Sequence, residues 1–210
     1  MKPLVISFYT DELYSRLASR LARSCEAYGL GVEIEEREDL GSWVANCGQK
    51  PTFILGMLEF HDRDVLWVDA DAEFVSEPVG LDEQEGDLGL FITKWNLYMS
   101  GTLLFRNTVA SREMLGGWIQ EQKRFLDLPD EKTMRAVLER GGAVKTWQLS
   151  PGYAYVFDVW PHRYPDCKPI VLHKQASRVH EMALRSFRPD RRVHSEGVHP
   201  EVREFNELCS

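Results

Sequence analysis

The stretch Asp64-Val-Leu-Trp-Val-Asp-Ala-Asp-Ala-Glu-Phe74 joins a short apolar run to two closely spaced carboxylates. Val65 to Val68 are too few for a helix and match a strand that is buried on both faces, as the strands of parallel sheets are. In open α/β sheets, ligands bind beyond the carboxyl ends of the strands, and Asp69 and Asp71 are placed there. The stretch therefore predicts an α/β fold with a polar site after residue 68.

Asp69 and Asp71 are separated by one residue, and a turn after the strand would let both carboxylates face one cation. Mg²⁺ and Mn²⁺ are usually held by one or two carboxylates together with substrate phosphates. The pair therefore predicts a metal-assisted site for a diphosphate substrate. The alternative is a plain turn, because aspartate is a common turn residue after a strand.

The rest of the chain alternates between strand and helix patterns. Strands are predicted at 4–9, 32–36, 88–93, 100–105, 145–149 and 170–173, and helices at 13–25, 52–60, 109–126, 130–140 and near 200–208. Asp130 is expected to cap its helix, and residues 39–51 are expected to form a loop. The opening strand, helix and strand predict a right-handed parallel crossover.

The composition is that of a globular protein with an acidic balance. A length of 210 residues fits one domain, and the net charge of −8 argues against non-specific nucleic-acid binding as the main role. The cysteines lie far apart and form no metal-type pair, so we expect reduced thiols at Cys25, Cys47, Cys167 and Cys209. Without a leader or an apolar stretch of membrane-spanning length, we expect a soluble, cytoplasmic protein with no membrane partner.

A second apolar run, residues 169–172, also ends in polar side chains. His173 is a candidate third ligand beside Asp69 and Asp71, because imidazole is an acceptable ligand for Mn²⁺. Lys174 and Arg178 are candidates to hold a diphosphate through charge-assisted hydrogen bonds. Alternatively, His173 caps the strand, and the two cations are solvated.

Asp130 and Glu131 follow Pro129 at the start of a predicted helix, where a carboxylate gains from the helix dipole. They are candidates for a catalytic acid or base that contacts an acceptor, although capping alone would explain Asp130. Gly101 would let the backbone approach a ligand closely, or it marks a bend in the strand that follows.

Taken in order, these motifs resemble the nucleotide-diphospho-sugar transferases of the GT-A fold over roughly residues 3–178. The resemblance rests on Thr10 after the first strand, Lys50 ahead of the acidic pair, Asp69-Ala-Asp71, Ser-Gly-x-Leu-x-Phe at 100–105 with Asn107 behind it, Asp130-Glu131 where relatives often have Asp-Gln, and Leu172-His173. It implies an α/β, single-domain, GT-A (Rossmann-like) fold with a mixed, mostly parallel sheet flanked by helices. Its parts would be a nucleotide-sugar-binding half at 1–95, an acceptor half at 96–178 and a tail at 179–210.

The resemblance also implies an activity, namely Mn²⁺- or Mg²⁺-dependent transfer of a sugar from a nucleotide-diphosphate donor, with a UDP-sugar expected, to a hydroxyl acceptor. The implied metal ligands are Asp69, Asp71 and His173, and the implied donor-binding residues are Thr10, Tyr14, Lys50, Asp69, Gly101, Lys174 and Arg178. Retaining relatives often follow the late histidine with glycine and Lys-Pro-Trp, whereas Lys-Gln-Ala-Ser-Arg follows His173. The choice between retention and inversion therefore stays open.

Two other functions share part of the pattern. A haloacid-dehalogenase-like phosphatase also places Asp-x-Asp after an apolar strand, but it usually has Thr or Val where this chain has Glu73. A non-catalytic nucleotide-sugar-binding protein would share the donor site without turnover.

The acceptor is open among a small molecule, a protein, a glycan and modified DNA. From residue 173 to 192 six cations oppose two carboxylates, and they are Lys174, Arg178, Arg185, Arg188, Arg191 and Arg192. This surplus is either a solvated face or a patch for a phosphate-rich acceptor, such as DNA that carries hydroxylated bases.

Overall fold

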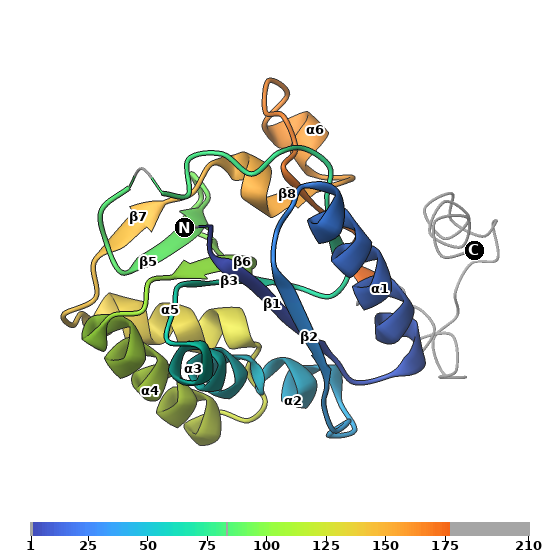
Figure 1. The fold of residues 1–210 in the computed structure, drawn as a ribbon. Helices are drawn as coiled ribbons and strands as arrows, with labels where there is room; N and C mark the ends of the chain where they lie inside the picture. The colour runs from blue at the N-terminus through green and yellow to red at the C-terminus, as the bar shows by residue number, and fades with distance from the viewer. Residues whose placement is uncertain (1, 83, 177–210) are drawn as a thin grey trace, which may run out of the picture. The chain divides into compact units, whose positions relative to one another are not determined.

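The computed structural model describes residues 2–82 and 84–176. The chain divides into two units, Met1–His173 and Lys174–Ser210, and residues 174–176 are the described part of the second. The predicted helix near 200–208, Arg178 and the four arginines between 185 and 192 lie outside the described residues. All the elements named below belong to the first unit, shown as a coloured ribbon in Figure 1.

A six-stranded sheet with the order β2-β1-β3-β6-β5-β7 forms the centre of the first unit. Its strands are β1 (Leu4–Tyr9), β2 (Val32–Glu36), β3 (Val65–Val68), β5 (Leu88–Ile92), β6 (Tyr98–Phe105) and β7 (Thr146–Gln148). The pairs β1–β2, β1–β3 and β5–β7 are parallel, and β6 is antiparallel to both of its neighbours. The predicted mixed, mostly parallel sheet is confirmed, as is the parallel pairing across the first helix.

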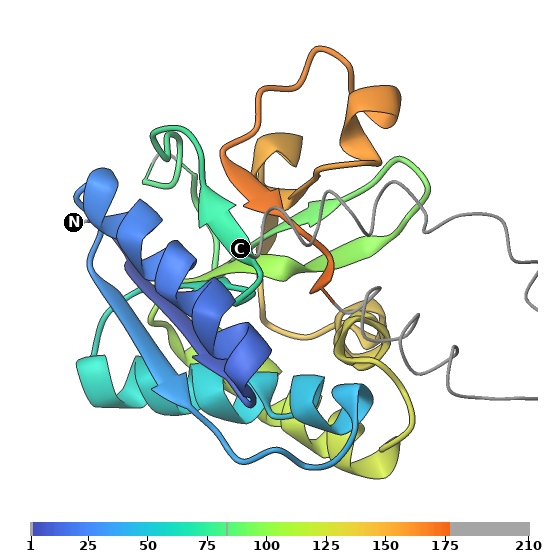
Figure 2. The same ribbon diagram turned by 90° about the vertical axis from the view of Figure 1, so that its right-hand side faces the viewer.

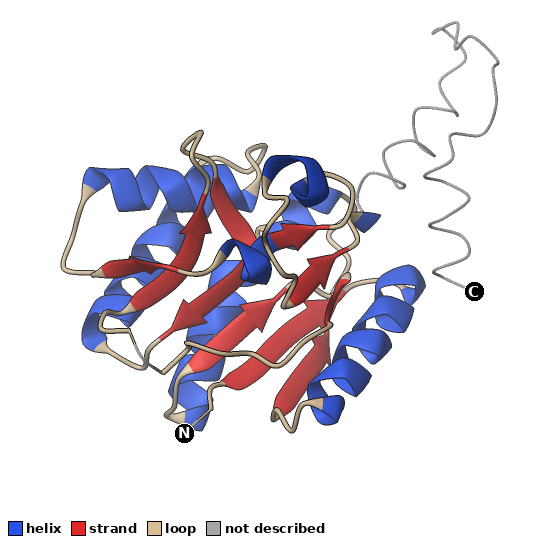
Figure 3. Ribbon diagram, turned by 90° about the horizontal axis from the view of Figure 1, so that it is seen from above, coloured by secondary structure: helices blue, strands red, loops and turns tan. Residues whose placement is uncertain are grey.

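Helices cover both faces of this sheet. Figure 1 shows α1 (Glu12–Ala27) on one side and α3 (Lys50–His61), α4 (Val109–Arg124) and α5 (Asp130–Arg140) on the other, and Figure 3 shows helices (blue) on both sides of the strands (red). Successive side chains of a strand point to opposite faces. In β3, Leu66 and Val68 therefore pack in the α1 layer, whereas Val65 and Trp67 pack in the layer of α3, α4 and α5.

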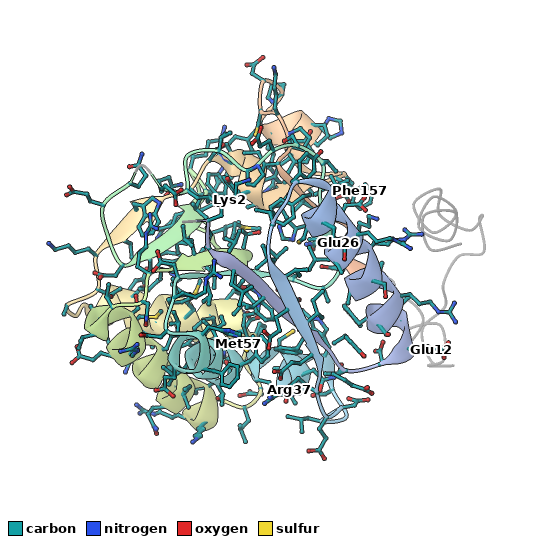
Figure 4. The ribbon with its side chains drawn as sticks, in the orientation of Figure 1. Lys2, Glu12, Glu26, Arg37, Met57 and Phe157 are labelled. Carbon is teal, nitrogen blue, oxygen red and sulfur yellow. The ribbon has the colours of Figure 1, made fainter. Side chains whose placement is uncertain are left out.

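The spaces between the sheet and the helices are filled with side chains, as Figure 4 shows, with Met57 of α3 among them. The α1 helix begins at Glu12, one residue before the predicted range, because the Asp11 carboxylate accepts a hydrogen bond from the Tyr14 N–H at 2.8 Å. Among the described helices, none combines the length and the apolar character that a membrane crossing requires. The described cysteines, Cys25, Cys47 and Cys167, are free thiols.

A second sheet of three short strands, in the order β4-β9-β8, adjoins the end of β3. It consists of β4 (Ala72–Phe74), β9 (Val171–His173) and β8 (Tyr155–Val156). β4 runs antiparallel to β9 with Ala72 opposite His173, and β8 runs parallel to β9. Because β4 begins directly after the acidic pair, this pairing fixes where the chain near residue 173 lies. The sequence predicted β9 but neither β4 nor β8.

Further unpredicted elements are the short helix η1 (Pro151–Ala154) and α6 (Trp160–Arg163). Figure 2 shows the segment from η1 to β9 (orange) beside the hairpin of β5 and β6 (green), and η1 contacts both of these strands. The segment from η1 to β9 therefore packs against β5 and β6.

Two local predictions are wrong. Residues 39–51 are not a loop throughout, because the Ser42 hydroxyl accepts a hydrogen bond from the Ala45 N–H at 3.2 Å and starts α2 (Trp43–Cys47), after which α3 begins at Lys50. Asp130 does not cap α5 either. The cap position is Pro129 and carries no side-chain hydrogen bond, while Asp130 is the first helical residue. Its side chain is buried and faces a lysine from α3, described below.

Candidate functional site

Asp69, Asp71 and His173 meet at the carboxyl end of β3. One candidate ligand atom from each residue lies within 4.8 Å of those of the other two. The Ala72 N–H donates to the Asp69 carbonyl oxygen at 3.0 Å, which closes the turn that holds the two carboxylates together. The pairing of Ala72 with His173 then brings in the imidazole. The structure thus brings together the three residues that the sequence analysis named as metal ligands.

The partners of the His173 ring determine which nitrogen carries its proton. Nε2 lies 3.2 Å from the carbonyl oxygen of Tyr153 and 3.0 Å from the Thr102 hydroxyl oxygen. Because a carbonyl oxygen only accepts, a proton on Nε2 satisfies this contact, and the lone pair then stays on Nδ1. Such a hydrogen bond at the far nitrogen is the usual way to orient a metal-binding histidine. Neither Thr102 nor Tyr153 was predicted to be a site residue from the sequence.

Gly101 lies on β6 beside the end of β3, and its carbonyl oxygen accepts from the Asp69 N–H at 2.9 Å. A Cβ atom at this position would lie 2.8 Å from Cε1 of His173 and 3.1 Å from Oδ2 of Asp69. The first distance is shorter than non-bonded carbon atoms tolerate, so a side chain would displace the imidazole. At Gly101 the backbone therefore comes close to the candidate metal ligands Asp69 and His173.

Lys50, at the start of α3, is buried and joins three parts of the site. Its Nζ lies 3.0 Å from Oδ1 of Asp69 and 2.6 Å from Oδ2 of Asp130, and it donates to the Ser100 carbonyl oxygen at 3.2 Å. Burial alone would lower the pKa of Lys50, but the carboxylates of Asp130 and Asp69 outweigh it and raise that pKa above its usual value. The lysine therefore stays charged.

The Trp67 side chain completes this cluster from β3. Its Nε1 donates to Oδ1 of Asp69 at 2.9 Å, and its ring lies 5.2 Å from Nζ of Lys50. A cation near an indole face is stabilised by the ring's electron density. Asp69 is thus held on one side by Trp67 and Lys50 while its other oxygen, Oδ2, lies toward Gly101.

The candidate ligands Asp69 and Asp71, together with Asp130, form a cluster of carboxylates in which the ammonium of Lys50 lies within ion-pair distance of Asp69 and Asp130. Two carboxylate oxygens with one imidazole nitrogen form a donor set that suits Mn²⁺ and also Mg²⁺. The residues present therefore fit the ion that the sequence predicts.

Tyr14 and Cys47 also face this negative cluster. Burial raises the pKa of the Tyr14 hydroxyl, and the charges of Asp71 and Asp69 raise it further. Burial and the Asp130 carboxylate raise the pKa of the Cys47 thiol. Both groups are therefore neutral near pH 7. Cys47 was expected only as a reduced thiol. Its position near the site depends on α2, which was not predicted from the sequence.

The other predicted residues are placed less directly. Glu131 follows Asp130 in the first turn of α5, and partial burial together with the Asp130 carboxylate raises its pKa. The Thr10 hydroxyl accepts a hydrogen bond from Nδ2 of Asn46 at 3.2 Å. Lys174 belongs to the second unit, and Arg178 lies outside the described residues. The roles predicted for these residues stay predictions.

A solved structure with a similar fold is that of a glycosyltransferase involved in the glycosylation of the major capsid of PBCV-1. The two superpose with a TM-score of 0.67 at 15% sequence identity, over 88% of this chain and 100% of the other. No protein-family model and no curated protein sequence matches the chain. At this identity the likeness establishes the fold, and the chain has the fold of a glycosyltransferase.

Proposed function

We propose that the protein is a metal-dependent glycosyltransferase of the GT-A class that moves a sugar from a nucleotide-diphosphate sugar to a hydroxyl group. The observation that carries the proposal is the meeting of Asp69, Asp71 and His173 at the carboxyl end of β3. Ligand sites of α/β sheets lie at this end of the strands. The fold it shares with a glycosyltransferase supports the same reaction class.

Asp69, Asp71 and Nδ1 of His173 would hold Mn²⁺ or Mg²⁺. When bound, the ion would offset the negative charge that builds on the diphosphate as it leaves the sugar. The expected donor is a UDP-sugar, with Thr10 and Tyr14 near the nucleoside. A neutral Tyr14 can donate a hydrogen bond to a nearby carboxylate or to the donor, which an ionised phenolate could not.

Lys50 takes an orienting role in this proposal. An ammonium group has three N–H donors, and Nζ has three protein partners in Asp69, Asp130 and Ser100. Its charge therefore acts by fixing the two carboxylates rather than by contacting the donor phosphates. The Asp69 carboxylate is then held in one orientation toward the ion. It therefore does not have to reorient when the ion binds, as a flexible carboxylate would.

Glu131 is our candidate for the base that accepts the proton of the acceptor hydroxyl. Asp130 is less suited to this role, because it is buried and tied to Lys50. A carboxylate with a raised pKa is a stronger base, and the pKa of Glu131 is raised. This assignment belongs to an inverting reaction, so the anomeric configuration of the product, read by NMR, tests it directly.

The acceptor must offer a hydroxyl group, and a small molecule, a protein, a glycan and a hydroxylated DNA base all do so. The arginines that suggested DNA lie outside the described residues. The basis for DNA as acceptor therefore rests on sequence alone, and hydroxymethylated DNA belongs in the acceptor panel as one member among several.

The test is to incubate the protein with Mn²⁺ and a panel of nucleotide sugars and to follow donor hydrolysis by mass spectrometry. We expect slow release of free sugar and nucleoside diphosphate from one donor, and none in EDTA. Asp71→Ala should abolish this release, whereas Glu59→Ala, which removes an exposed carboxylate on α3, should leave it unchanged.

Three results would contradict the proposal. Undiminished turnover in EDTA would show that the reaction does not need a metal ion. Release of inorganic phosphate from phosphate monoesters, with the nucleotide sugar intact, would indicate the phosphatase. Metal-dependent binding of the donor with no turnover, even when an acceptor panel is added, would indicate a nucleotide-sugar-binding protein without catalytic activity.

A further inference from the structure

The hairpin between β5 and β6 presents a tryptophan to solvent. Trp95 is 48% exposed, although a large aromatic side chain is usually buried. The hairpin lies at the same edge of the sheet as the carboxylates, because β6 is antiparallel to β3 and Gly101 lies beside Asp69. Leu97 precedes Gly101 by four residues, which places the hairpin about 13 Å along β6 from the site.

This hairpin is held firmly in place. Thr93 is buried, and its backbone N–H donates to the Leu97 carbonyl oxygen at 2.9 Å while its hydroxyl accepts from the Leu97 N–H at 3.1 Å. Asn96 adopts the left-handed conformation (φ 60°) that the turn needs, which asparagine tolerates better than most residues. The exposed indole is therefore carried on a defined backbone rather than on a loose loop.

Arg135 connects the hairpin to the start of α5. Its Nη1 donates to the Asn96 carbonyl oxygen at 3.3 Å, and its guanidinium group lies 5.5 Å from the ring of Tyr98. Glu131 precedes Arg135 by four residues, so the two share one face of α5 with their Cβ atoms about 6 Å apart. The candidate base thus lies one helical turn from a residue that contacts the hairpin.

Two cations gather at the exposed indole. Nζ of Lys94 and Cζ of Arg163 each lie 4.7 Å from the ring centre of Trp95, and Tyr164 packs edge-on against the same ring at 6.3 Å. Within residues 2–82 and 84–176, neither Lys94 nor Arg163 has a carboxylate within ion-pair distance. Two unbalanced positive charges are thus held side by side in a chain with a net charge of −8.

We infer that Trp95, Lys94 and Arg163 form the anion-binding part of the acceptor site, and that the acceptor is a small hydroxylated molecule carrying a phosphate group. The inference rests on the proposed function, since it names the acceptor class of that site. Two cations match a phosphate monoester, which carries about −1.5 to −2 charges at pH 7, better than they match a single carboxylate. Such an acceptor would bind its phosphate at Arg163 and would have to present a hydroxyl to Glu131, one helical turn from the Arg135 that contacts the hairpin.

A nucleic-acid acceptor fits this surface less well. Proteins that bind single strands use a positively charged groove that follows the backbone, with bases stacked on open aromatic faces. Here the ring of Trp95 is already engaged by Lys94 and Arg163, and the third cation nearby, Arg135, is paired with Glu139 at 2.8 Å. Two free cations in an acidic chain suit one phosphate group rather than a polymer of them.

The test uses the indole N–H signal of Trp95 in ¹⁵N-labelled full-length protein, assigned by comparison with Trp95→Phe. UDP and Mg²⁺ are kept at saturation so that the donor site is filled. Glucose 6-phosphate is then titrated against glucose, and against a single-stranded oligonucleotide, at constant ionic strength. We expect a saturable shift with glucose 6-phosphate and none with the other two.

Arg163→Ala should weaken glucose 6-phosphate binding about tenfold, the loss expected for one charge-assisted hydrogen bond. The matched control is Arg124→Ala, because Arg124 also lies over an aromatic ring, that of Phe125 at the end of α4. That variant should bind like the wild type. Unchanged binding in Arg163→Ala, or equal loss in both variants, would overturn the inference.

Equal shifts with glucose would make the hairpin a platform for neutral sugars, and a shift with the oligonucleotide alone would assign it to nucleic acid. Both results would overturn the inference. UDP binding is measured separately by calorimetry with and without Mg²⁺. If UDP does not bind but Trp95 still responds to glucose 6-phosphate, the proposed function fails while the phosphate site stands.

Discussion

The buried end of β3 and the exposed hairpin of β5 and β6 both hold cationic side chains near an indole, and they treat them in opposite ways. Lys50 is 3% exposed, and protein oxygens occupy its three donor directions. Lys94 and Arg163 lie at an indole that is 48% exposed, and neither has a carboxylate partner among the described residues. A fully paired cation orients its neighbours, whereas a surface cation without a carboxylate partner can bind a ligand.

Lys50→Met is expected to have the largest effect of the variants considered. The variant leaves Asp69 and Asp130 without their shared cation in a buried setting, which typically costs about 3–5 kcal/mol of folding free energy. Urea unfolding would measure this loss. The pKa of Lys50 is raised, so its stabilising effect is complete below the pKa of an unfolded lysine, about 10.4, and fades only above it. The loss should therefore be the same at about pH 6 and about pH 9, because both lie below the pKa of an unfolded lysine.

Lys50→Arg sharpens the same point. A retained charge should recover part of the stability, while the larger planar group changes the direction of Asp69 and so weakens Mn²⁺ binding. Full recovery of both stability and Mn²⁺ affinity in the arginine variant would mean that Lys50 supplies charge without orienting its partners.

Glu131→Gln tests the residue that lies between the two regions. If Glu131 is the base, transfer should fall about 10²–10⁴-fold, and the fall of activity toward acidic pH should disappear. In the wild type that fall should occur at a pH above the usual glutamate value of 4.5, because the pKa is raised and the base form exists only above it. A pH profile of kcat with the same acidic limb in the variant would assign the proton transfer to another group.

Gly101→Ala crowds the buried region without removing a charge. The added methyl group would lie 2.8 Å from the His173 ring, so we expect Mn²⁺ affinity to fall about 10–100-fold, as it does when metal ligands are disturbed. Gly116→Ala on α4 is the control, since no neighbouring atom lies within 4 Å of the added Cβ. It should leave the metal titration unchanged and add about 0.5–1 kcal/mol of stability. Equal Mn²⁺ titrations for both variants would show that crowding at Gly101 does not affect metal binding.

The smallest effect belongs to the exposed region. Arg163→Ala should change the free energy of unfolding by less than about 0.5 kcal/mol, as surface substitutions usually do, even though it removes a cation from an indole. Thermal unfolding would measure it. A loss similar to that of Lys50→Met would show that the cations at Trp95 hold the fold together and are not reserved for a ligand.

The parts of the fold that were predictable from sequence are those with a local pattern. β3 is a continuous apolar run and β1 is interrupted only by the buried Ser7, because both strands are buried on both faces, and Asp11 signals the start of α1. By contrast, β4 has three residues and forms only because β9 pairs with it. No local preference marks such a strand, since its stability comes from a segment distant in the chain.

The same distinction applies to the candidate site. Asp69, Asp71 and His173 could be named because each follows an apolar run. The burial of Lys50 could not be foreseen, because a lysine is buried only when distant carboxylates pair with it, and here they come from the residue after β3 and from α5. Cys47 and Tyr153 carried no chemical signal, and they reach the site through short elements that the sequence pattern does not reveal.

The pairing of β4 with β9 has a consequence for how the protein folds. Asp71 and His173 are separated by roughly a hundred residues of chain, so the loop that joins them is among the longest that the first unit must close. Contacts of such sequence separation form late, since their loop entropy must be overcome before they contribute. During synthesis the two carboxylates therefore exist, without their imidazole, for most of the time that the unit takes to emerge. The three candidate metal ligands therefore come together only when the first unit is complete.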